Sequence, residues 1–586
     1  MMNHIRSALG SSNSTQETNR TGMAGTSGTS GTSASRPPTL ASGSLAGRPA
    51  SSSEALMRSR VATSVPAMSH RMLALLGALQ MQGVSNESIN NMRGAFAALG
   101  VSDPDNILDA ARNACVTGSA RGFEATLMLI KENIIGLPPS GSREGSLLHA
   151  IAAESDDAIH RRSAEQAGGY ITIADRVKSL VKVGADINSL DQNGRSPIEV
   201  AVVSKSSCME ASVSAFAAAG ADLERKKERN MTLLMRAVQS GTLPMVVALL
   251  KNRPNIHART DDGVNALHIA TSYSNDVKMV EALLAGGANI EVSNVDGSNS
   301  FSHAAASASD PDMIRTLFRY GGKVNGTSAM GNTPLHYAAA YSMSPEVIDA
   351  LLECGADIHA KGKEGDTVLH LAARNSESPA VLTKLLERGA NVHAINQNGF
   401  SALHMMAAVT QCPALIEIMV DHGADIHARL SNGAMPLHVA CSNSPHPLVI
   451  PALLKCGANV NAPGSLGFSP LHVAAKYGVS ALDFSILQAQ GANINARSQT
   501  QLTPLHHAAK FSRPDMLTML LANGAEINAR DEDRNTPLHL AALEGNDGGR
   551  TLQILLSRGA DPALTNKDGK TARDIMVARG QAWPRG

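Results

Sequence analysis

The sequence predicts an all-α repeat solenoid of stacked helix-turn-helix units with projecting β-hairpin-like turns, preceded by a disordered N-terminal tail. Three observations support this fold class. The chain has 586 residues, far more than one compact core usually holds, and only 3% of them are aromatic. A histidine motif recurs about every 34 residues, and a Gly-Ala marker follows it at a nearly constant distance. Such a period is the sequence signature of a stacked repeat architecture.

Residues 1–66 are expected to form a disordered leader rich in Ser, Thr and Gly. The first 50 residues contain ten Ser, seven Thr and seven Gly, and Glu17 is the only acidic residue among them. A segment with so little apolar surface cannot offset the entropy that ordering costs. Residues 1–100 contain eight Arg and three Glu, a net charge of +5, so residues 101–586 carry −5.

Residues 67–102 follow as a short helical segment. The apolar pattern predicts helices over about 68–81 and 86–98, and Ser85 is placed to cap the second one. Two helices of this length are too short to form a domain. We therefore expect them either to pack on the front of the array or to serve as a docking segment.

The repeat motif has the form Thr-Pro-Leu-His. It is intact at Thr333–His336, Thr503–His506 and Thr536–His539, with close variants elsewhere. Its histidine recurs at intervals of 33 to 35 residues, at His268, His303, His336, His370, His404, His438, His472, His506 and His539. A second marker, such as Gly355-Ala-Asp-Ile, follows the histidine by about 18 to 20 residues. Two markers in a fixed phase define one repeating unit.

Each part of this unit has a physical reason. Thr caps free N–H groups at the start of a helix, and Pro at the first helical position loses no hydrogen bond. In the unit at Thr333, a short first helix precedes a second helix over about 345–352, whose apolar face only a neighbouring unit can bury. Gly355 then supplies the left-handed residue that ends the second helix. Most units run to 34 residues instead of 33, and the extra residue lies in a Ser/Pro-rich link such as 342–345.

These units resemble ankyrin repeats, whose pattern combines a T-P-L-H start with a G-A-D-V-N exit. The resemblance covers roughly residues 103–586, with an opening cap over 103–141, an array of about twelve units over 142–565 and a closing cap over 566–586. The units begin near Ser146, Ser196, Thr232, Asn265, Ser300, Thr333, Thr367, Ser401, Met435, Ser469, Thr503 and Thr536. An insertion around 156–171 lengthens the first unit, and the units at Ser196 and Thr232 lack the histidine.

The resemblance implies a structural role for the motif histidines, because the family uses this residue to hydrogen-bond between neighbouring turns. In this sequence the position holds the nine histidines above and His149. Four others, His257, His359, His393 and His427, replace the Asn that usually follows the exit marker. Each lies at least about one repeat from the next, too far for shared metal ligation, although a pH-sensitive rim formed by these histidines is an open alternative.

The resemblance also implies that the extended turns and first helices line a concave face that binds other proteins. The candidate partner-binding residues on this face are Tyr273, Tyr341, Phe400, Phe468, Lys476, Tyr477, Leu502, His507, Lys510 and Phe511. Those from Phe468 to Phe511 fall on two adjacent units. Aromatic and cationic groups on a rigid surface are typical of a binding hot spot. The alternative is that each ring only fills a gap against its neighbour.

Charge and composition exclude several classes of function. Lys and Arg total 51 and Asp and Glu total 51, so the chain lacks the basic excess of a nucleic-acid or membrane-surface protein. No apolar stretch reaches the roughly 20 residues that cross a bilayer. The six cysteines form no C-x-x-C pair, which indicates reduced thiols and a reducing compartment.

Catalytic motifs are absent from the sequence. The chain contains no G-x-S-x-G, no G-x-x-x-x-G-K-[ST], no H-E-x-x-H and no kinase-like H-R-D set. We also expect no further domain after the closing cap, because the sequence stops at Gly586. We therefore expect no enzymatic activity, no cofactor and no metal.

The expected function is that of a non-enzymatic, monomeric scaffold that binds one or more client proteins. A Ser/Thr/Gly-rich, acid-poor N-terminus ahead of a eukaryote-like interaction module resembles bacterial effectors of type III secretion systems. That resemblance implies secretion into the cytoplasm of a host cell. Three alternatives stay open: a cytoplasmic adaptor that is not secreted, an organelle-targeted protein, and an array that targets an activity carried or recruited by residues 1–100.

Overall fold

The computed structural model describes residues 68–81, 84–117, 119–131, 135–137, 146–153, 171–204, 209–443, 446–545, 547 and 549–583. The chain divides into two compact units. The first comprises Met1–Cys115 and Ser119–Gly136, and the second comprises Val116–Gly118 and Leu137–Gly586. The predicted leader over 1–66 and almost all of the insertion around 156–171 lie outside the described residues.

The first unit contains short helices that share one core. They are α2 (His70–Met81), α3 (Asn86–Leu99), the 3-10 turn η1 (Pro104–Asn106), most of α4 (Ile107–Thr117) and α5 (Ala120–Lys131). Ser85 caps α3, since its hydroxyl accepts a hydrogen bond from the Ser88 N–H at 3.1 Å. α3 packs against α5, and Phe96 and Phe123 are buried. The predicted helical segment at 67–102 therefore shares its core with helices of the predicted opening cap.

The second unit is a stack of helix pairs followed by one closing helix. The first helices of the pairs are α6 (Leu147–Ala152), α9 (Pro197–Val203), α11 (Leu233–Gln239), α13 (Ala266–Ile269), α15 (Ser300–Ser307), α17 (Pro334–Tyr341), α19 (Val368–Asn375), α21 (Ala402–Val409), α23 (Pro436–Asn443), α25 (Pro470–Tyr477), α27 (Pro504–Lys510) and α29 (Pro537–Glu544). The second helices are α8 (Ile173–Lys182), α10 (Met209–Ala218), α12 (Leu243–Lys251), α14 (Val277–Ala285), α16 (Pro311–Arg319), α18 (Pro345–Glu353), α20 (Pro379–Glu387), α22 (Ala414–Asp421), α24 (Val449–Lys455), α26 (Ala481–Ala489), α28 (Pro514–Ala522) and α30 (Arg550–Ser557). The closing helix is α31 (Ala572–Ala578).

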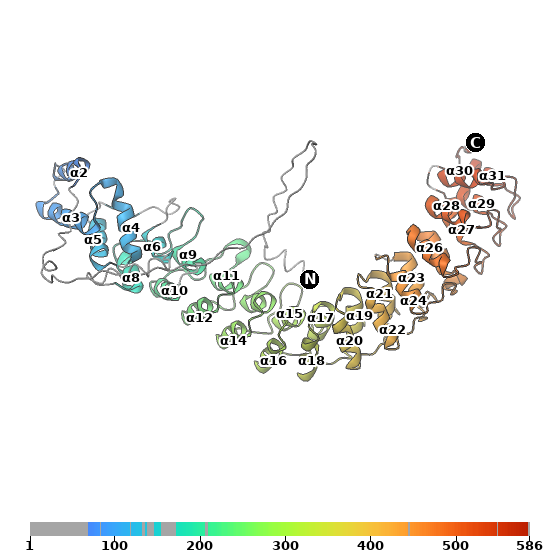
Figure 1. Cartoon of the computed structure of the whole chain (residues 1–586), viewed down its shortest axis with the longest axis horizontal. Coiled ribbons are helices and arrows are strands. Elements are labelled where there is room, and N and C mark those ends of the chain that lie inside the picture. Colours follow the sequence, from blue (N-terminus) through green and yellow to red (C-terminus); the bar gives the residue numbers. More distant parts are fainter. Residues whose placement is uncertain are drawn as a thin grey trace, which may run out of the picture. The chain divides into compact units, whose positions relative to one another are not determined.

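These helices lie in two layers. Successive first helices such as α15, α17 and α19 contact one another, and so do successive second helices such as α16, α18 and α20; Figure 1 shows them as two rows. The turns between pairs project from the stack and contain only isolated β-bridges, such as Ser293 with Asn299, and no strand among the described residues. The predicted fold class, an all-α repeat solenoid, is confirmed.

The unit at Thr333 shows why these residues form this structure. Thr333 is the N-cap of α17 in an extended conformation, and a proline occupies the first helical position. Leu335 of the first helix and Leu351 of the second are fully buried, and each such side chain stabilises the fold by about 1.5–3 kcal/mol. Gly355 then takes a φ of 88°, a left-handed conformation that favours glycine, and the chain leaves the second helix.

One unit accommodates its extra residue inside the first helix. The N-caps of successive first helices, Asn265 and Asn299, are 34 residues apart, one more than the 33 of a usual ankyrin repeat. Here α13 continues into a π-helical turn, η3 (Ala270–Ser274), which ends at Asn275 with a φ of 47°. A π turn takes one more residue per turn than an α turn, so the following unit keeps its place in the stack. In this unit the extra residue therefore does not lie in the link between the helices, where the sequence placed it for most units.

Candidate functional site

The motif histidines close the N-termini of the first helices. In α17, Nδ1 of His336 accepts a hydrogen bond from the Thr333 backbone N–H at 3.2 Å, and Nε2 lies 3.2 Å from the Asp366 carbonyl oxygen in the next unit. The same pair of hydrogen bonds is made by His149, His268, His370, His404, His438, His472, His506 and His539. Because Nδ1 accepts, Nε2 carries the proton and donates to the carbonyl. Each histidine thus joins its own helix cap to the neighbouring turn.

Burial keeps these histidines neutral. It lowers the pKa of His268 and of His472 to about 4, and it lowers the pKa of His336 in the same way. A protonated ring would lose the Nδ1 lone pair that accepts the cap hydrogen bond. Both ring nitrogens are already engaged, so these side chains hold the stack together and have no nitrogen left for a ligand.

His303 does not follow this pattern. The N-cap of α15 is Asn299, one residue before the predicted start at Ser300, so His303 lies one position too far along the helix to reach the cap N–H. Its Nδ1 instead lies 2.9 Å from the Ser272 hydroxyl, and burial lowers its pKa to about 3. The expected family hydrogen bond is therefore wrong for His303, because a different residue caps its helix.

An early unit without the histidine caps its helix with a carboxylate. In α9, Glu199 accepts a hydrogen bond from the Ser196 N–H at 2.8 Å. Arg236 approaches the same carboxylate at 2.6 Å and Lys227 at 3.1 Å. Burial alone would raise the pKa of Glu199, but these hydrogen bonds and cations outweigh it and lower the pKa. In the next unit Thr232 caps α11 with its hydroxyl alone.

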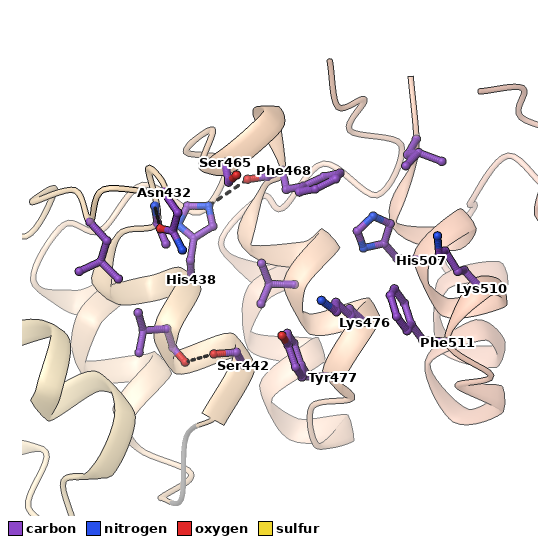
Figure 2. Close-up of a pocket in the computed structure, with 15 residues that line it drawn as sticks. Asn432, His438, Ser442, Ser465, Phe468, Lys476, Tyr477, His507, Lys510 and Phe511 are labelled. Carbon is purple, nitrogen blue, oxygen red and sulfur yellow. Dashed lines mark hydrogen bonds between the residues drawn. The ribbon is translucent and has the colours of Figure 1, made fainter. Parts of the chain in front are cut away.

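A groove of about 460 Å³ opens along α23, α25 and α27. All of the candidate residues that fall on two adjacent units line it, namely Phe468, Lys476, Tyr477, Leu502, His507, Lys510 and Phe511. The remaining lining residues are Leu430, Asn432, Ala434, His438, Val439, Ser442, Ser465 and Val473. Figure 2 shows Lys476 between the rings of Tyr477 and Phe511, with Phe468 and His507 beside them. The structure therefore brings these candidate residues together around one groove.

Aromatic rings and one ammonium group form the centre of the groove. The ring centroids of Phe468 and His507 are 4.7 Å apart in an edge-on arrangement, and those of His507 and Phe511 are 6.0 Å apart. Nζ of Lys476 lies 4.8 Å from the Tyr477 centroid and 5.1 Å from the Phe511 centroid. At these distances the electron-rich ring faces attract the cation.

The two lysines of the groove differ in their charge balance. Nζ of Lys510 lies 3.0 Å from the Glu544 carboxylate in the next unit, so its charge is compensated. No carboxylate of the described residues lies within ion-pair distance of Lys476. Among the described residues that line the groove, none is Asp or Glu. The groove therefore carries one uncompensated positive charge.

His507 is a buried polar residue with an unmet hydrogen bond. Its side chain is only 7% exposed, and its Nδ1 has no hydrogen-bond partner among the described residues. Burial, helped by the nearby His472 and Lys476, lowers its pKa to about 3, so the ring is neutral. Apolar side chains occupy the same helix position, four residues after the N-cap, in most other units: Ile269, Leu371, Met405, Val439, Val473 and Leu540. In α15, whose N-cap is Asn299, this position holds His303. A buried polar atom without a partner costs about 1–3 kcal/mol, which a ligand could recover.

Three of the candidate residues do not line the groove. Tyr273 and Tyr341 belong to earlier units, and burial raises the pKa of the Tyr341 hydroxyl. The Phe400 ring lies 6.1 Å from the His404 ring in an edge-on contact within its own unit. That contact has the geometry of the packing alternative, in which a ring fills a gap against its neighbour.

Sequence reasoning missed one wall of the groove. Val439 and Ser442 of α23 and Val473 of α25 form this wall, and none is aromatic or charged. The available signal was the repeat register, because Val439, Val473 and His507 occupy one position spaced by 34 residues. Reading that column would have shown a polar residue following two aliphatic ones.

The described part of the chain lacks the features of a metal site and of a membrane span. Across the described ranges, no group of three or more His, Cys, Asp and Glu side chains is arranged to hold a metal ion. None of the described helices is long and apolar enough to span a bilayer. Cys354, Cys412, Cys441 and Cys456 are free thiols, and burial raises the pKa of Cys441.

Comparisons with known proteins identify the repeats. The family model of ankyrin repeats, which describes three copies, matches residues 206–294, 267–362, 339–430, 405–497 and 471–566. These matches overlap and include every unit that lines the groove. They begin within the predicted unit at Ser196, so the predicted unit at Ser146 precedes them. A comparison with curated proteins finds no match.

Proposed function

Because the chain belongs to the ankyrin-repeat family, we propose that it is a non-enzymatic, monomeric scaffold that binds a client protein through the groove along α23, α25 and α27. Ankyrin repeats are in general protein–protein interaction modules, and the family is typically non-enzymatic. The proposal assigns the binding to one part of the array and to named side chains.

The observation that carries this proposal is that two polar groups of the groove lack partners among the described residues. Nδ1 of His507 is buried without a partner, and Lys476 has no described counter-ion. Next to them, Tyr477 is 46% exposed and Phe511 is 38% exposed. Partly exposed aromatic side chains beside a cation are typical binding anchors, since they bury a large area at a small entropic cost. Packing between the repeats leaves these groups available.

Affinity capture with the full chain tests the proposal. The native chain and the double variant Tyr477→Ala/Phe511→Ala would be used as bait in plant and animal cell lysates. We expect a client that the native chain retains and that binds the double variant about 100-fold or more weakly, because two anchors are lost. The matched control is Tyr273→Ala, which removes an aromatic residue at the equivalent repeat position outside the groove. Equal capture by the native chain and the double variant would contradict the assignment.

The proposed place of action is the cytoplasm of a host cell, reached through a type III secretion system. Only the composition of the leader, rich in Ser, Thr and Gly and poor in acids, together with a eukaryote-like interaction module, supports this part. A fusion of residues 1–66 to a reporter enzyme that is active only in host cytoplasm tests it. We expect reporter activity in host cells infected by bacteria with an intact secretion apparatus. Activity that persists without the apparatus would mean entry by another route, and activity that never appears would favour an adaptor that is not secreted.

A further inference from the structure

Resting on the proposed function, we infer that the groove recognises a linear acidic segment of the client. In this arrangement an aromatic or leucine side chain of the segment packs against Phe468 and Phe511. A neighbouring Asp or Glu carboxylate of the segment pairs with Lys476. The following observations on charge, shape and hydrogen bonding each restrict the occupant.

The charge of the groove selects a carboxylate. Lys476 is uncompensated, whereas Lys510 is paired with Glu544 at 3.0 Å, and no acidic residue lines the groove in the described part of the chain. A carboxylate entering this partly desolvated space forms a charge-assisted hydrogen bond that is shorter and stronger than a neutral one. One free ammonium group matches one carboxylate. Binding of nucleic acid would need many cations along a backbone instead.

The shape of the groove selects a narrow segment. Its volume of about 460 Å³ falls within the range of small-ligand pockets, about 300–1,000 Å³. Such a space admits one or two side chains and excludes a flat protein face. The rings of Phe468, His507 and Phe511 form its apolar part. The Phe468 and His507 centroids are 4.7 Å apart, and the His507 and Phe511 centroids are 6.0 Å apart. An aromatic or leucine side chain inserted there would be in contact with all three rings.

The unpaired nitrogen of the groove favours a ligand whose backbone N–H and carbonyl groups are free to form hydrogen bonds. Nδ1 of His507 is buried and unpaired among the described residues, and Figure 2 shows its ring between Phe468 and Phe511. A neutral imidazole offers one donor and one acceptor nitrogen. An extended peptide presents an N–H and a carbonyl at every residue, whereas the backbone of a folded client is mostly paired already. A linear segment can therefore satisfy Nδ1 while its side chains occupy the groove.

The leader of the chain itself is a poor occupant. Residues 1–66 contain six Arg and two Glu, a net charge of +4. Placing such a segment in the groove would bring positive charge against Lys476. The occupant is therefore a segment of another protein with the opposite charge.

Selection from a random dodecapeptide phage library on the immobilised full chain tests this inference. Peptides that bind would be counter-selected on Lys476→Gln, and the matched control is Lys278→Gln, an exposed lysine outside the groove. We expect enriched peptides with an aromatic or leucine residue next to Asp or Glu. Synthetic copies should lose about 10- to 100-fold in affinity when the acid becomes an amide or when the chain carries Lys476→Gln, because a charged hydrogen bond is lost.

The possible outcomes separate this inference from the proposed function. Enriched peptides that lack an acid, or that bind Lys476→Gln as well as the native chain, would overturn the acidic specificity while binding at the groove stands. Selection that enriches no peptide would also overturn the inference, and a client captured in the lysate experiment would then bind as a folded surface. Loss of binding in Lys278→Gln as well would place the contact outside the groove.

Discussion

Two pairs of residues at equivalent repeat positions show how one architecture produces a hydrogen-bonded contact in one region and a groove with an unpaired nitrogen in another. Ser298 and Tyr337 are 39 residues apart, and so are Phe468 and His507. In the first pair the Ser298 hydroxyl donates to the Tyr337 hydroxyl at 3.0 Å. In the second pair two rings meet edge-on at 4.7 Å, and Nδ1 of His507 has no partner among the described residues.

A neighbouring repeat position also differs between the two regions. Three residues beyond Tyr337 the first region has Ala340, which is buried, whereas the position equivalent to Ala340 in the second region is Lys510. The backbone hydrogen bonds of the two units are alike, since His336 and His506 make the same cap contacts. The side chains at a few fixed positions therefore decide whether the polar atoms between two repeats are paired with each other or left without a partner among the described residues.

The largest effect we expect is loss of stability in acid, because both regions contain buried neutral histidines. His268 and His472 have a pKa of about 4, and His303 and His507 a pKa of about 3. These values lie below the unfolded value near 6.5, so the unfolded chain binds more protons. Stability from these residues is complete above about pH 6.5 and is lost as the pH falls toward 4.

Near pH 5 these four side chains alone should take up about four protons on unfolding. Thermal unfolding followed by circular dichroism between pH 7 and pH 4.5 measures this slope. His507→Leu should reduce the uptake by about one proton, whereas Tyr337→Leu should leave it unchanged. An unchanged slope in His507→Leu would mean that the ring is not held neutral by burial.

The next largest effect is expected from exchanging one pair for the other. The double variant Phe468→Ser/His507→Tyr introduces the Ser298–Tyr337 arrangement into the groove. We expect selected acidic peptides to bind it about 100-fold more weakly, because both an apolar wall and the unpaired nitrogen are removed. Fluorescence anisotropy measures the affinity, and circular dichroism checks that helicity is retained. Full affinity in a folded double variant would show that this pair does not define the groove.

A smaller effect, opposite in sign for the two regions, is expected from single substitutions. His507→Leu removes a buried unpaired nitrogen and should raise the free energy of unfolding by about 1 kcal/mol while weakening peptide binding about 10-fold. Tyr337→Phe removes a satisfied hydrogen bond and should lower the free energy of unfolding by about 1 kcal/mol. Urea unfolding measures both. A loss of stability in both variants would mean that Nδ1 of His507 is paired.

The smallest effect is expected at the compensated lysine. Lys510→Gln breaks a partly exposed ion pair with Glu544, so it should change the free energy of unfolding by less than about 1 kcal/mol. Peptide affinity should change by less than about twofold, since the charge of Lys510 is already balanced. Isothermal titration calorimetry compares the peptide affinity of this variant with that of Lys476→Gln. Equal losses in the two variants would mean that both lysines contact the ligand.

Much of this architecture was accessible from the sequence, because the contacts of a repeat are local. A spacing of 33 to 35 residues between histidines, together with glycines such as Gly355, set the helix pairs and their order. In a stack, each unit contacts only its neighbours, so a periodic sequence is enough to define the register. The same register places Phe468, Tyr477 and Phe511 on adjacent units from the sequence alone.

The tertiary structure alone decided which polar and charged groups have partners. His303 has the motif spacing but not the motif contacts, because Asn299 caps its helix. His507 and Tyr337 share a position, yet the tyrosine hydroxyl is hydrogen-bonded whereas Nδ1 of His507 has no partner among the described residues. A hydrogen bond depends on distances of a few tenths of an ångström between side chains of neighbouring units. A linear pattern of residues carries no such distance, so the groove and its unmet hydrogen bond emerge only when the repeats are stacked.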